Sequence, residues 1–244
     1  MTKLSGTFAS EWDVCWEYEE NQPWYPDEQI VRFLARYVCR RMGVAHDAIR
    51  HYSCAHPSGL DLGCGKGRHV ILMRELGIEA YGLDVSERAV EFAAAWLKSK
   101  GFSADLTKGS MSHLHYPDEK FDFVLSHGVL DHALAAVRQA TVNEVERVLK
   151  PNGLFFVSVI SDRDSAFGMG HQIEDKTWLL KEGFESDIPQ AFFDLQRVRQ
   201  EFSQFQIESI VLCECETVEG RSLIGTDKHY QRDSRYYLTL RKKS

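Results

Sequence analysis

The chain of 244 residues lacks the features of exported and membrane-spanning proteins. Its N-terminus has no apolar segment of the kind found in signal peptides, and no apolar run approaches the length of a membrane span. The six cysteines include no C-x-x-C pair. Together these absences predict a cytoplasmic protein with free thiols in a reducing compartment and without a membrane partner.

The chain also lacks an excess of positive charge. Lysine and arginine number 29 against 36 aspartates and glutamates, which gives a net charge of −7 at pH 7. Because an acidic surface repels phosphate backbones, nucleic acid is not an expected partner. Hydrophobic residues make up 43% and charged residues 27%, a globular balance that allows a sizeable core. Composition leaves open whether the protein is a monomer or a homodimer.

A regular alternation of strand and helix patterns begins at residue 58. Short apolar runs alternate with amphipathic stretches up to residue 160. Such an alternation implies parallel pairing and right-handed crossovers, and so a doubly wound α/β fold. The expected strands span residues 59–62, 79–83, 105–107, 121–126 and 154–160, and the expected helices span 66–76, 86–100 and 131–149.

The pattern weakens after residue 160. Residues 161–189 are interpreted as a loop region and residues 190–202 as a helix. Two strands are expected at 205–215 and 234–241 with no helix between them, which favours an antiparallel hairpin at the sheet edge. The complete sheet is therefore predicted to have seven, mostly parallel strands.

The first 57 residues are predicted to form helices that cap a main domain of residues 58–244. Aromatic and acidic residues crowd the first 25 positions. Asp27 is placed to cap a helix that begins near Glu28. Apolar residues from Ile30 to Met42 recur at helical spacing, so this helix is expected to have one apolar face.

A glycine-rich turn after the first expected strand is the main chemical signal. Residues 60–67 read Leu-Asp-Leu-Gly-Cys-Gly-Lys-Gly, a spacing that differs from the dinucleotide motif G-x-G-x-x-G and from a phosphate loop. The glycines let a ligand approach the backbone, and the following helix offers free N–H groups. Asp61, before the turn, would repel a pyrophosphate and suits a ligand that carries an ammonium or sulfonium cation.

A second acid, Asp84, ends the next expected strand. An acid at this place can accept hydrogen bonds from a ribose diol. The alternative interpretation is that Asp61 only shapes the turn and that Asp84 only precedes a helix cap. The combination of the turn with both acids favours a cofactor site.

These residues resemble the motifs of the class I S-adenosylmethionine-dependent methyltransferases. Residues 60–67 match the first motif, Asp84 the acid of the second strand, residues 121–126 the fourth-strand motif and residues 147–154 the turn into the fifth strand. The likeness covers about residues 58–160, and residues 24–36 are similar to the opening of bacterial small-molecule members. The resemblance implies a Rossmann-like methyltransferase fold, S-adenosyl-L-methionine as cofactor and S-adenosyl-L-homocysteine as product.

The resemblance also implies roles for the matched positions. Asp61 would act near the methionine amino group, partly through water, and Asp84 would hold the ribose hydroxyls. Ser110 stands where the family usually has an acid, so adenine recognition would depend more on Met111 and on backbone contacts. The other positions of the implied cofactor site are Gly63, Cys64, Gly65, Val85, Ser126 and His127.

The loop after the fourth expected strand carries the candidate catalytic residues His127 and Asp131. Ligands of open α/β sheets bind at the carboxyl ends of the strands, which places this loop at the mouth of the site. His127 would contact the cofactor or acceptor or act as a base, and Asp131 or His132 would orient the acceptor. The structural alternatives are a hydrogen-bonded His127 and an Asp131 that caps a helix.

Two further segments are candidates for acceptor contacts. His171 lies in a glycine-containing loop that could move as a lid, although it could equally be a surface histidine. Trp24 and Tyr25 could close over the cofactor, or could pack in the core of a capping helix. No metal site is expected, because His113 and His115 have no evident third ligand nearby.

The sequence thus predicts methyl transfer to a small-molecule acceptor. The transfer is an in-line displacement at a sulfonium carbon and requires neither a metal nor a covalent intermediate. The absence of a nucleic-acid module favours a metabolite as acceptor. The alternatives are a non-catalytic S-adenosylmethionine-binding partner or sensor and a nicotinamide-dependent oxidoreductase, and the glycine spacing and Asp61 argue against the latter.

Overall fold

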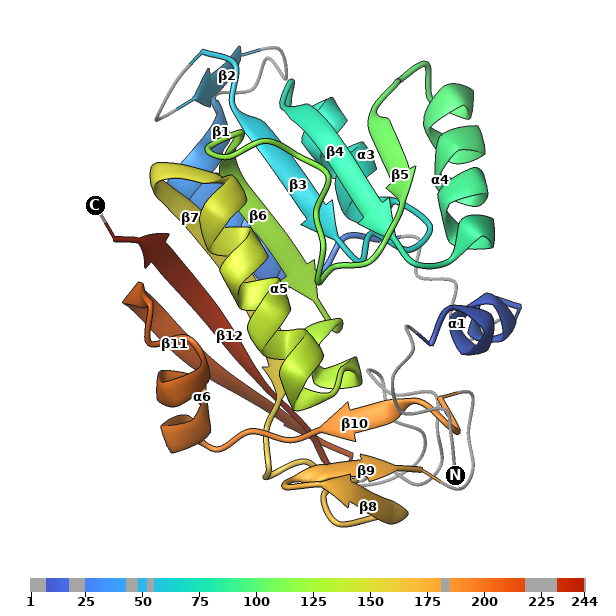
Figure 1. Cartoon of the computed structure of the whole chain (residues 1–244). Coiled ribbons are helices and arrows are strands. Elements are labelled where there is room, and N and C mark those ends of the chain that lie inside the picture. The colour runs from blue at the N-terminus through green and yellow to red at the C-terminus, as the bar shows by residue number, and fades with distance from the viewer. Residues whose placement is uncertain are drawn as a thin grey trace.

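The fold is built around a seven-stranded sheet with the order β11-β12-β7-β6-β3-β4-β5 (Figure 1). The computed structural model describes residues 8–17, 25–42, 48–51, 55–180, 185–217 and 232–243. Strands β3 to β7 pair in parallel, whereas β12 pairs antiparallel with both β7 and β11. The strands are β3 Ser58–Leu62, β4 Glu79–Asp84, β5 Asp105–Lys108, β6 Phe121–His127, β7 Leu149–Ile160, β11 Phe205–Glu216 and β12 Arg232–Lys242.

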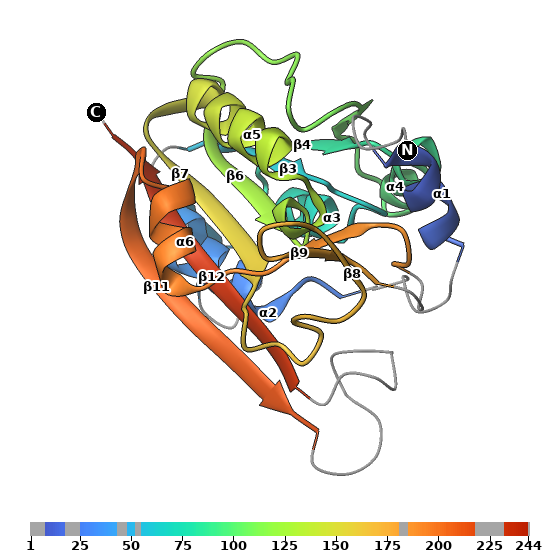
Figure 2. The ribbon, with the colours of Figure 1, turned by 60° about the horizontal axis from the view of Figure 1, so that its bottom comes forward.

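Helices cover both faces of this sheet, which confirms the doubly wound fold (Figures 1 and 2). One core contains residues of α5 and α6, and the other contains residues of α2, α3 and α4. Among the described residues, no helix is long and apolar enough to cross a membrane. The α-helices are α1 Ala9–Cys15, α2 Glu28–Phe33, α3 Arg68–Glu75, α4 Glu87–Ser99, α5 Ala135–Val148 and α6 Leu195–Glu201.

The strand order reverses beside β3. The chain passes outward from β3 through β4 to β5 and then returns to β6 on the other side of β3. The connections at the carboxyl ends of β3 and β6 therefore leave in opposite directions. A crevice outside these ends is the usual ligand site of an open α/β sheet.

The N-terminal segment differs in part from the prediction. Asp27 caps α2 as expected, because its carboxylate accepts hydrogen bonds from the backbone N–H groups of Gln29 and Ile30. The expected continuation of the helix to Met42 is wrong. A π-helical turn, Leu34–Val38, leads into β1 (Cys39–Met42), which pairs antiparallel with β2 (Ala48–His51). Nonlocal pairing thus overrides the helical spacing of the apolar residues.

The region after β7 also differs from the prediction. Residues 161–189 contain strands rather than only a loop, and a small antiparallel sheet has the order β10-β9-β8. Its strands are β8 His171–Glu174, β9 Thr177–Leu179 and β10 Pro189–Ala191. The helix expected from residue 190 begins only at Leu195, where Asp194 caps it by accepting from the backbone N–H of Arg197. Residues 189–191 instead pair with β9 and are buried.

The helix expected over residues 131–149 is divided in two. A short 3-10 helix, Leu130–His132, is followed by an extended link and then by α5. The remaining predicted strands and helices of residues 58–160 lie where the sequence placed them, with shifts of a few residues at their ends. The antiparallel hairpin of β11 and β12 at the sheet edge is confirmed.

The close pairing of Gly59 with Phe123 in the centre of the sheet gives a test of the fold. A Cβ atom at Gly59 would overlap the Phe123 ring, which lies directly across from it on β6. We expect Gly59→Ala to lower the free energy of unfolding by about 2 kcal/mol, measured in urea. In a double-mutant cycle with Phe123→Leu, the smaller side chain should relieve part of this loss. Strictly additive effects would contradict this packing.

Candidate cofactor and acceptor site

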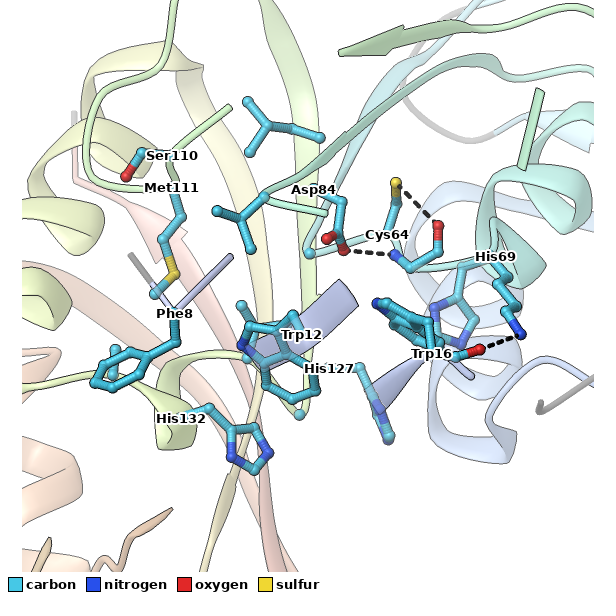
Figure 3. A pocket seen from close by; sticks show the side chains of 18 of the residues that line it. Phe8, Trp12, Trp16, Cys64, His69, Asp84, Ser110, Met111, His127 and His132 are labelled. Carbon is cyan, nitrogen blue, oxygen red and sulfur yellow. Dashed lines mark hydrogen bonds between the residues drawn. The ribbon is translucent and has the colours of Figure 1, made fainter. Parts of the chain in front are cut away.

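A cavity of about 410 Å³ lies at the crevice between the carboxyl ends of β3 and β6. This volume is within the range of small-molecule sites. Figure 3 shows its two ends, with Asp84 and Met111 on one side and His127 and His132 on the other. The predicted cofactor residues that line it are Gly63, Cys64, Gly65, Asp84, Val85, Ser110, Met111 and His127.

The glycine turn after β3 is fastened to the neighbouring strand β4. Gly63 and Gly65 have positive φ angles of 72° and 52°, which glycine adopts without strain. The N–H groups of Gly63 and Cys64 both donate to the Leu83 carbonyl, over 2.7 and 3.0 Å. These bonds hold the turn against the end of β4, at the wall of the cavity. The side chains of Val129 and Trp16 lie against Gly63 and Gly65, where a Cβ atom would overlap them.

Asp84 joins the turn to the end of β4. Its Oδ2 accepts a hydrogen bond of 2.8 Å from the Gly65 N–H, and its Oδ1 accepts one of 2.9 Å from the Ser86 N–H. Burial raises the pKa of Asp84 to about 6, although these two backbone donors lower it. Further donors facing the cavity, such as the hydroxyls of a ribose, would favour the ionised form. The position of Asp84 thus suits the predicted ribose contact.

Asp61 does not line the cavity, whereas the resemblance implied a place near the methionine amino group, partly through water. Its side chain is buried behind the turn, and its Oδ2 has no hydrogen-bond partner. Nδ1 of His69 lies 3.6 Å from this oxygen, and His69 does line the cavity. An unpaired buried carboxylate oxygen requires a donor. This unpaired oxygen leaves Asp61 an acceptor for a donor such as a water molecule.

The far end of the cavity is apolar. Val85 and Met111 line it together with the backbone of Gly109, whose N–H donates to the Asp84 carbonyl over 2.8 Å. The hydroxyl of Ser110 lies 2.9 Å from that of Ser112, so it is engaged locally. An adenine ring placed here would meet apolar surface and backbone groups. This arrangement agrees with the absence of an acid at position 110.

The other end of the cavity holds two histidines and a carboxylate that the sequence did not bring together. Asp27 Oδ2 lies 3.0 Å from Nε2 of His127, and the backbone N–H of Asp27 donates to Nε2 of His69 over 3.2 Å. Burial lowers the pKa of His127, whereas Asp27 opposes this effect. Burial would raise the pKa of Asp27, but His127 and the N–H of Gln29 hold it well below its usual value. Neutral imidazole and ionised carboxylate therefore coexist at neutral pH.

Asp131 does not face the acceptor space, which corrects its predicted catalytic place. It is fully buried, and its Oδ2 accepts a 2.6 Å hydrogen bond from Nη1 of Arg235 on β12. Burial alone would raise the pKa of Asp131, but Arg235 lowers it. The alternative, a helix cap, does not hold either, since no side chain caps α5. Asp131 instead holds Arg235, which lines the cavity.

His132 lines the cavity as expected for an acceptor contact. Its Nδ1 lies 3.2 Å from the Pro189 carbonyl, and its Nε2 lies 3.7 Å from Glu185. The indole of Trp12 packs against the imidazole edge, with ring centroids 5.2 Å apart. Glu185, which lies between β9 and β10, therefore contributes to the wall, and the start of β10 supports His132.

Helix α1 closes one side of the cavity with aromatic residues other than the expected ones. Phe8, Trp12 and Trp16 line the cavity, and the Trp16 ring lies against Gly65 (Figure 3). Lys66 Nζ fixes α1 through a 3.1 Å bond to the Trp16 carbonyl. The prediction that an aromatic N-terminal segment covers the site thus agrees with the geometry, although the residues differ.

Several predicted contacts lie elsewhere in the structure. Tyr25 is exposed at 83% and does not line the cavity, and Trp24 lies outside the described residues. His171 is exposed in β8, so the idea of a mobile loop over the site does not hold for it. Ser126 is fully buried within β6 and does not reach the cavity. The next residue, His127, lines the cavity because successive residues of a strand point to opposite faces of the sheet.

Sequence reasoning missed the cavity residues that come from elements packed against the central strands. Arg68 and His69 begin α3, and the β12 residues Arg235 and Tyr237 reach across from the antiparallel hairpin. Only Arg68 and His69 could have been identified from the sequence, since they directly follow the glycine turn. Arg235 and Tyr237 have no local signal, because their place depends on the register of β12 with β7.

Part of the chain matches a family model described as a methyltransferase domain, over residues 60–157. A relative from Mycolicibacterium smegmatis, named as an S-adenosylmethionine-dependent methyltransferase, is 31% identical over 50% of this chain and 45% of its own length. A ubiquinone biosynthesis O-methyltransferase from Chelativorans sp. is 33% identical over 45% of this chain and 43% of its own length. The matched stretch is thus less than half of each relative.

The fold extends the likeness beyond the matched stretch. A SAM-dependent methyltransferase from Methanosarcina mazei superimposes with a TM-score of 0.66 at 20% identity, over 79% of this chain and 95% of that one. At this identity the superposition speaks for the fold. Residues 60–157 thus match a methyltransferase domain, and the fold is that of S-adenosylmethionine-dependent methyltransferases.

Proposed function

We propose that the protein transfers the methyl group of S-adenosylmethionine to a small-molecule acceptor held between α1, β12 and the small sheet. The observation that carries this function is the cavity that Asp84 and the glycine turn share with His127 and His132. In this cavity the proposed cofactor half, with Asp84 and the glycine turn, adjoins the proposed acceptor half, with His127 and His132. The cofactor supplies a methyl group that is activated on a sulfonium. The protein therefore has to bind the cofactor and the acceptor, align them and exclude water.

Each half of the cavity has a defined task in this proposal. Asp84 would accept from the ribose hydroxyls, and the turn would lie along the methionine path. Val85 and Met111 would hold the adenine. The acceptor would lie against Trp12, His132 and Tyr237, which offer flat apolar surface with a few polar groups. Helix α1 would exclude water from the reacting atoms.

The proposed acceptor is a metabolite rather than a macromolecule. The cavity is small, and α1 narrows its entrance with Phe8, Trp12 and Trp16. Some relatives are named as ubiquinone biosynthesis O-methyltransferases, which supports a small-molecule acceptor without identifying it. We further propose that the enzyme acts in the cytoplasm as a monomer or homodimer, without nucleic acid, and that residues 58–244 form its catalytic domain with residues 1–57 as a cap.

Calorimetry with two cofactors tests this function directly. We expect S-adenosylmethionine and S-adenosylhomocysteine to bind and NAD not to bind. Labelled methyl groups should then pass to a component of a metabolite extract. Binding without any transfer would favour a cofactor-binding partner or sensor protein, and tight NAD binding alone would favour an oxidoreductase.

Removing the charge of Asp84 should weaken cofactor binding. Asp84→Asn keeps the shape of the side chain but loses the charge that favours hydroxyl donors. We expect the Kd for S-adenosylhomocysteine to rise about 10- to 100-fold, as for the loss of hydrogen bonds to a charged group. The control is Asp105→Asn, an exposed acid at the start of β5 outside the cavity. Equal affinities of the two variants would count against the assigned ribose contact.

The raised pKa of Asp84 also predicts a pH dependence of binding. Ribose hydroxyls donate to the ionised carboxylate, so the cofactor binds this form better and lowers the pKa. Because the pKa of the free protein is about 6, affinity for S-adenosylhomocysteine should fall about tenfold between about pH 7 and about pH 5. Calorimetry across this range measures the effect. In Asp84→Asn this dependence should be lost, and a dependence unchanged in the variant would assign it to another group.

A further inference from the structure

We propose that Asp27 and His127 form a proton-accepting pair and that the acceptor is therefore a hydroxyl compound, most simply a phenol. This inference rests on the proposed methyl transfer. It gives His127 a task besides its implied place in the cofactor site, and Asp27 lies outside the matched residues 60–157. Its basis is the geometry of four side chains around His127.

The position of Asp27 is fixed by its backbone surroundings. The carboxylate caps α2 through the Gln29 N–H at 2.8 Å, and its own N–H donates to His69. Helix α2 is anchored in the core by Ile30 and Phe33, which are buried against strands of the main sheet. Oδ2 of Asp27 is thereby held 3.0 Å from Nε2 of His127.

This contact favours one tautomer of His127. The negative charge of the Asp27 carboxylate, 3.0 Å away, favours a proton on Nε2, although the contact lacks the geometry of a hydrogen bond. The lone pair of the ring is then on Nδ1. The ring is 16% exposed and lines the cavity. A carboxylate that orients an imidazole in this way also stabilises the imidazolium formed on protonation.

The other groups around His127 leave it neutral before reaction. His69 on α3 lies with its ring centroid 5.8 Å away, and its Nδ1 faces Asp61. Arg235 and Tyr237 approach from β12, and the Tyr237 ring centroid is 6.0 Å away. Arg235 is itself paired with Asp131. The only carboxylate in contact with His127 among the described residues is Asp27, so it provides the compensating charge.

A base of this kind matters for acceptors that keep their proton at neutral pH. Phenolic hydroxyls, with pKa values near 10, keep their proton at neutral pH, as alkylammonium groups do, whereas a thiol ionises more readily. In the balanced step the acceptor O–H bond breaks and its proton passes to Nδ1 of His127. The O–CH₃ bond forms as the C–S bond breaks, and that electron pair stays on sulfur. The aromatic walls of Trp12 and Tyr237 suit a planar phenol.

Nuclear magnetic resonance of the ring nitrogens tests the pair without an acceptor. Protein labelled with ¹⁵N-histidine should show His127, identified by its loss in His127→Gln, as the Nε2–H tautomer. In Asp27→Asn the pKa of His127 should fall by about one unit, because the stabilising charge is removed. The matched controls are His171→Gln and Asp175→Asn, two exposed positions on the small sheet. An Nδ1–H tautomer, or an unchanged pKa, would overturn the pair.

Transfer from ¹³C-methyl-labelled S-adenosylmethionine to a metabolite extract identifies the methylated atom. We expect an O-methyl carbon resonance in the product. His127→Gln and Asp27→Asn should lower the rate about a hundredfold or more and remove the acidic limb of the pH profile, whereas the two controls should not. An N-methyl or S-methyl product would refute the hydroxyl acceptor. Failure to bind S-adenosylmethionine would instead refute the methyltransferase function, and these outcomes are distinguishable.

Discussion

The carboxylate of Asp84 is the constraint on which the site depends. It links the glycine turn to the end of β4 through two backbone N–H groups and remains almost completely buried. Its pKa of about 6, against an ordinary 3.8, means that ionisation costs the empty protein about 3 kcal/mol of folding free energy at neutral pH. The protein is more stable by this amount in acid, where Asp84 is protonated, and it loses this extra stability as the pH rises from about 4 through about 6. A ligand that donates hydrogen bonds to Asp84 offsets the free energy that ionisation of the buried carboxylate costs. The burial that destabilises the empty protein therefore favours binding of the cofactor.

The N-terminal segment belongs to the site rather than only covering it. Helix α2 shares a core with α3 and the central strands, so Asp27 is held on a rigid element. Helix α1 contacts the turn through Lys66 and the end of α4 through Asp13, whose carboxylate accepts a 2.5 Å bond from Ser86. Helix α2 is thus held by packing in the core, and these polar bonds hold α1 at the wall of the cavity.

The acceptor end combines residues from parts of the chain that are far apart. Arg235 is held by Asp131 over 2.6 Å although 104 positions separate them. His132 meets Glu185 and the Pro189 carbonyl of the small sheet. The cofactor end, in contrast, is formed by successive strand ends within residues 60–111. The end of the cavity proposed for the acceptor is thus formed by elements outside the cofactor motifs.

The sequence by itself determined the parallel sheet, its helices and the cofactor end, because each is encoded by local signals. Apolar periodicity marks the strands and helices, and glycines and an acid at a strand end mark the turn. Only the tertiary structure decided the rest. The small sheet, β1 and the shortened α6 depend on pairing between distant residues, and so do the contacts of Asp27 with His127 and of Arg235 with Asp131. Such contacts arise from sheet register and core packing, which leave no periodic mark on the sequence that folds into them.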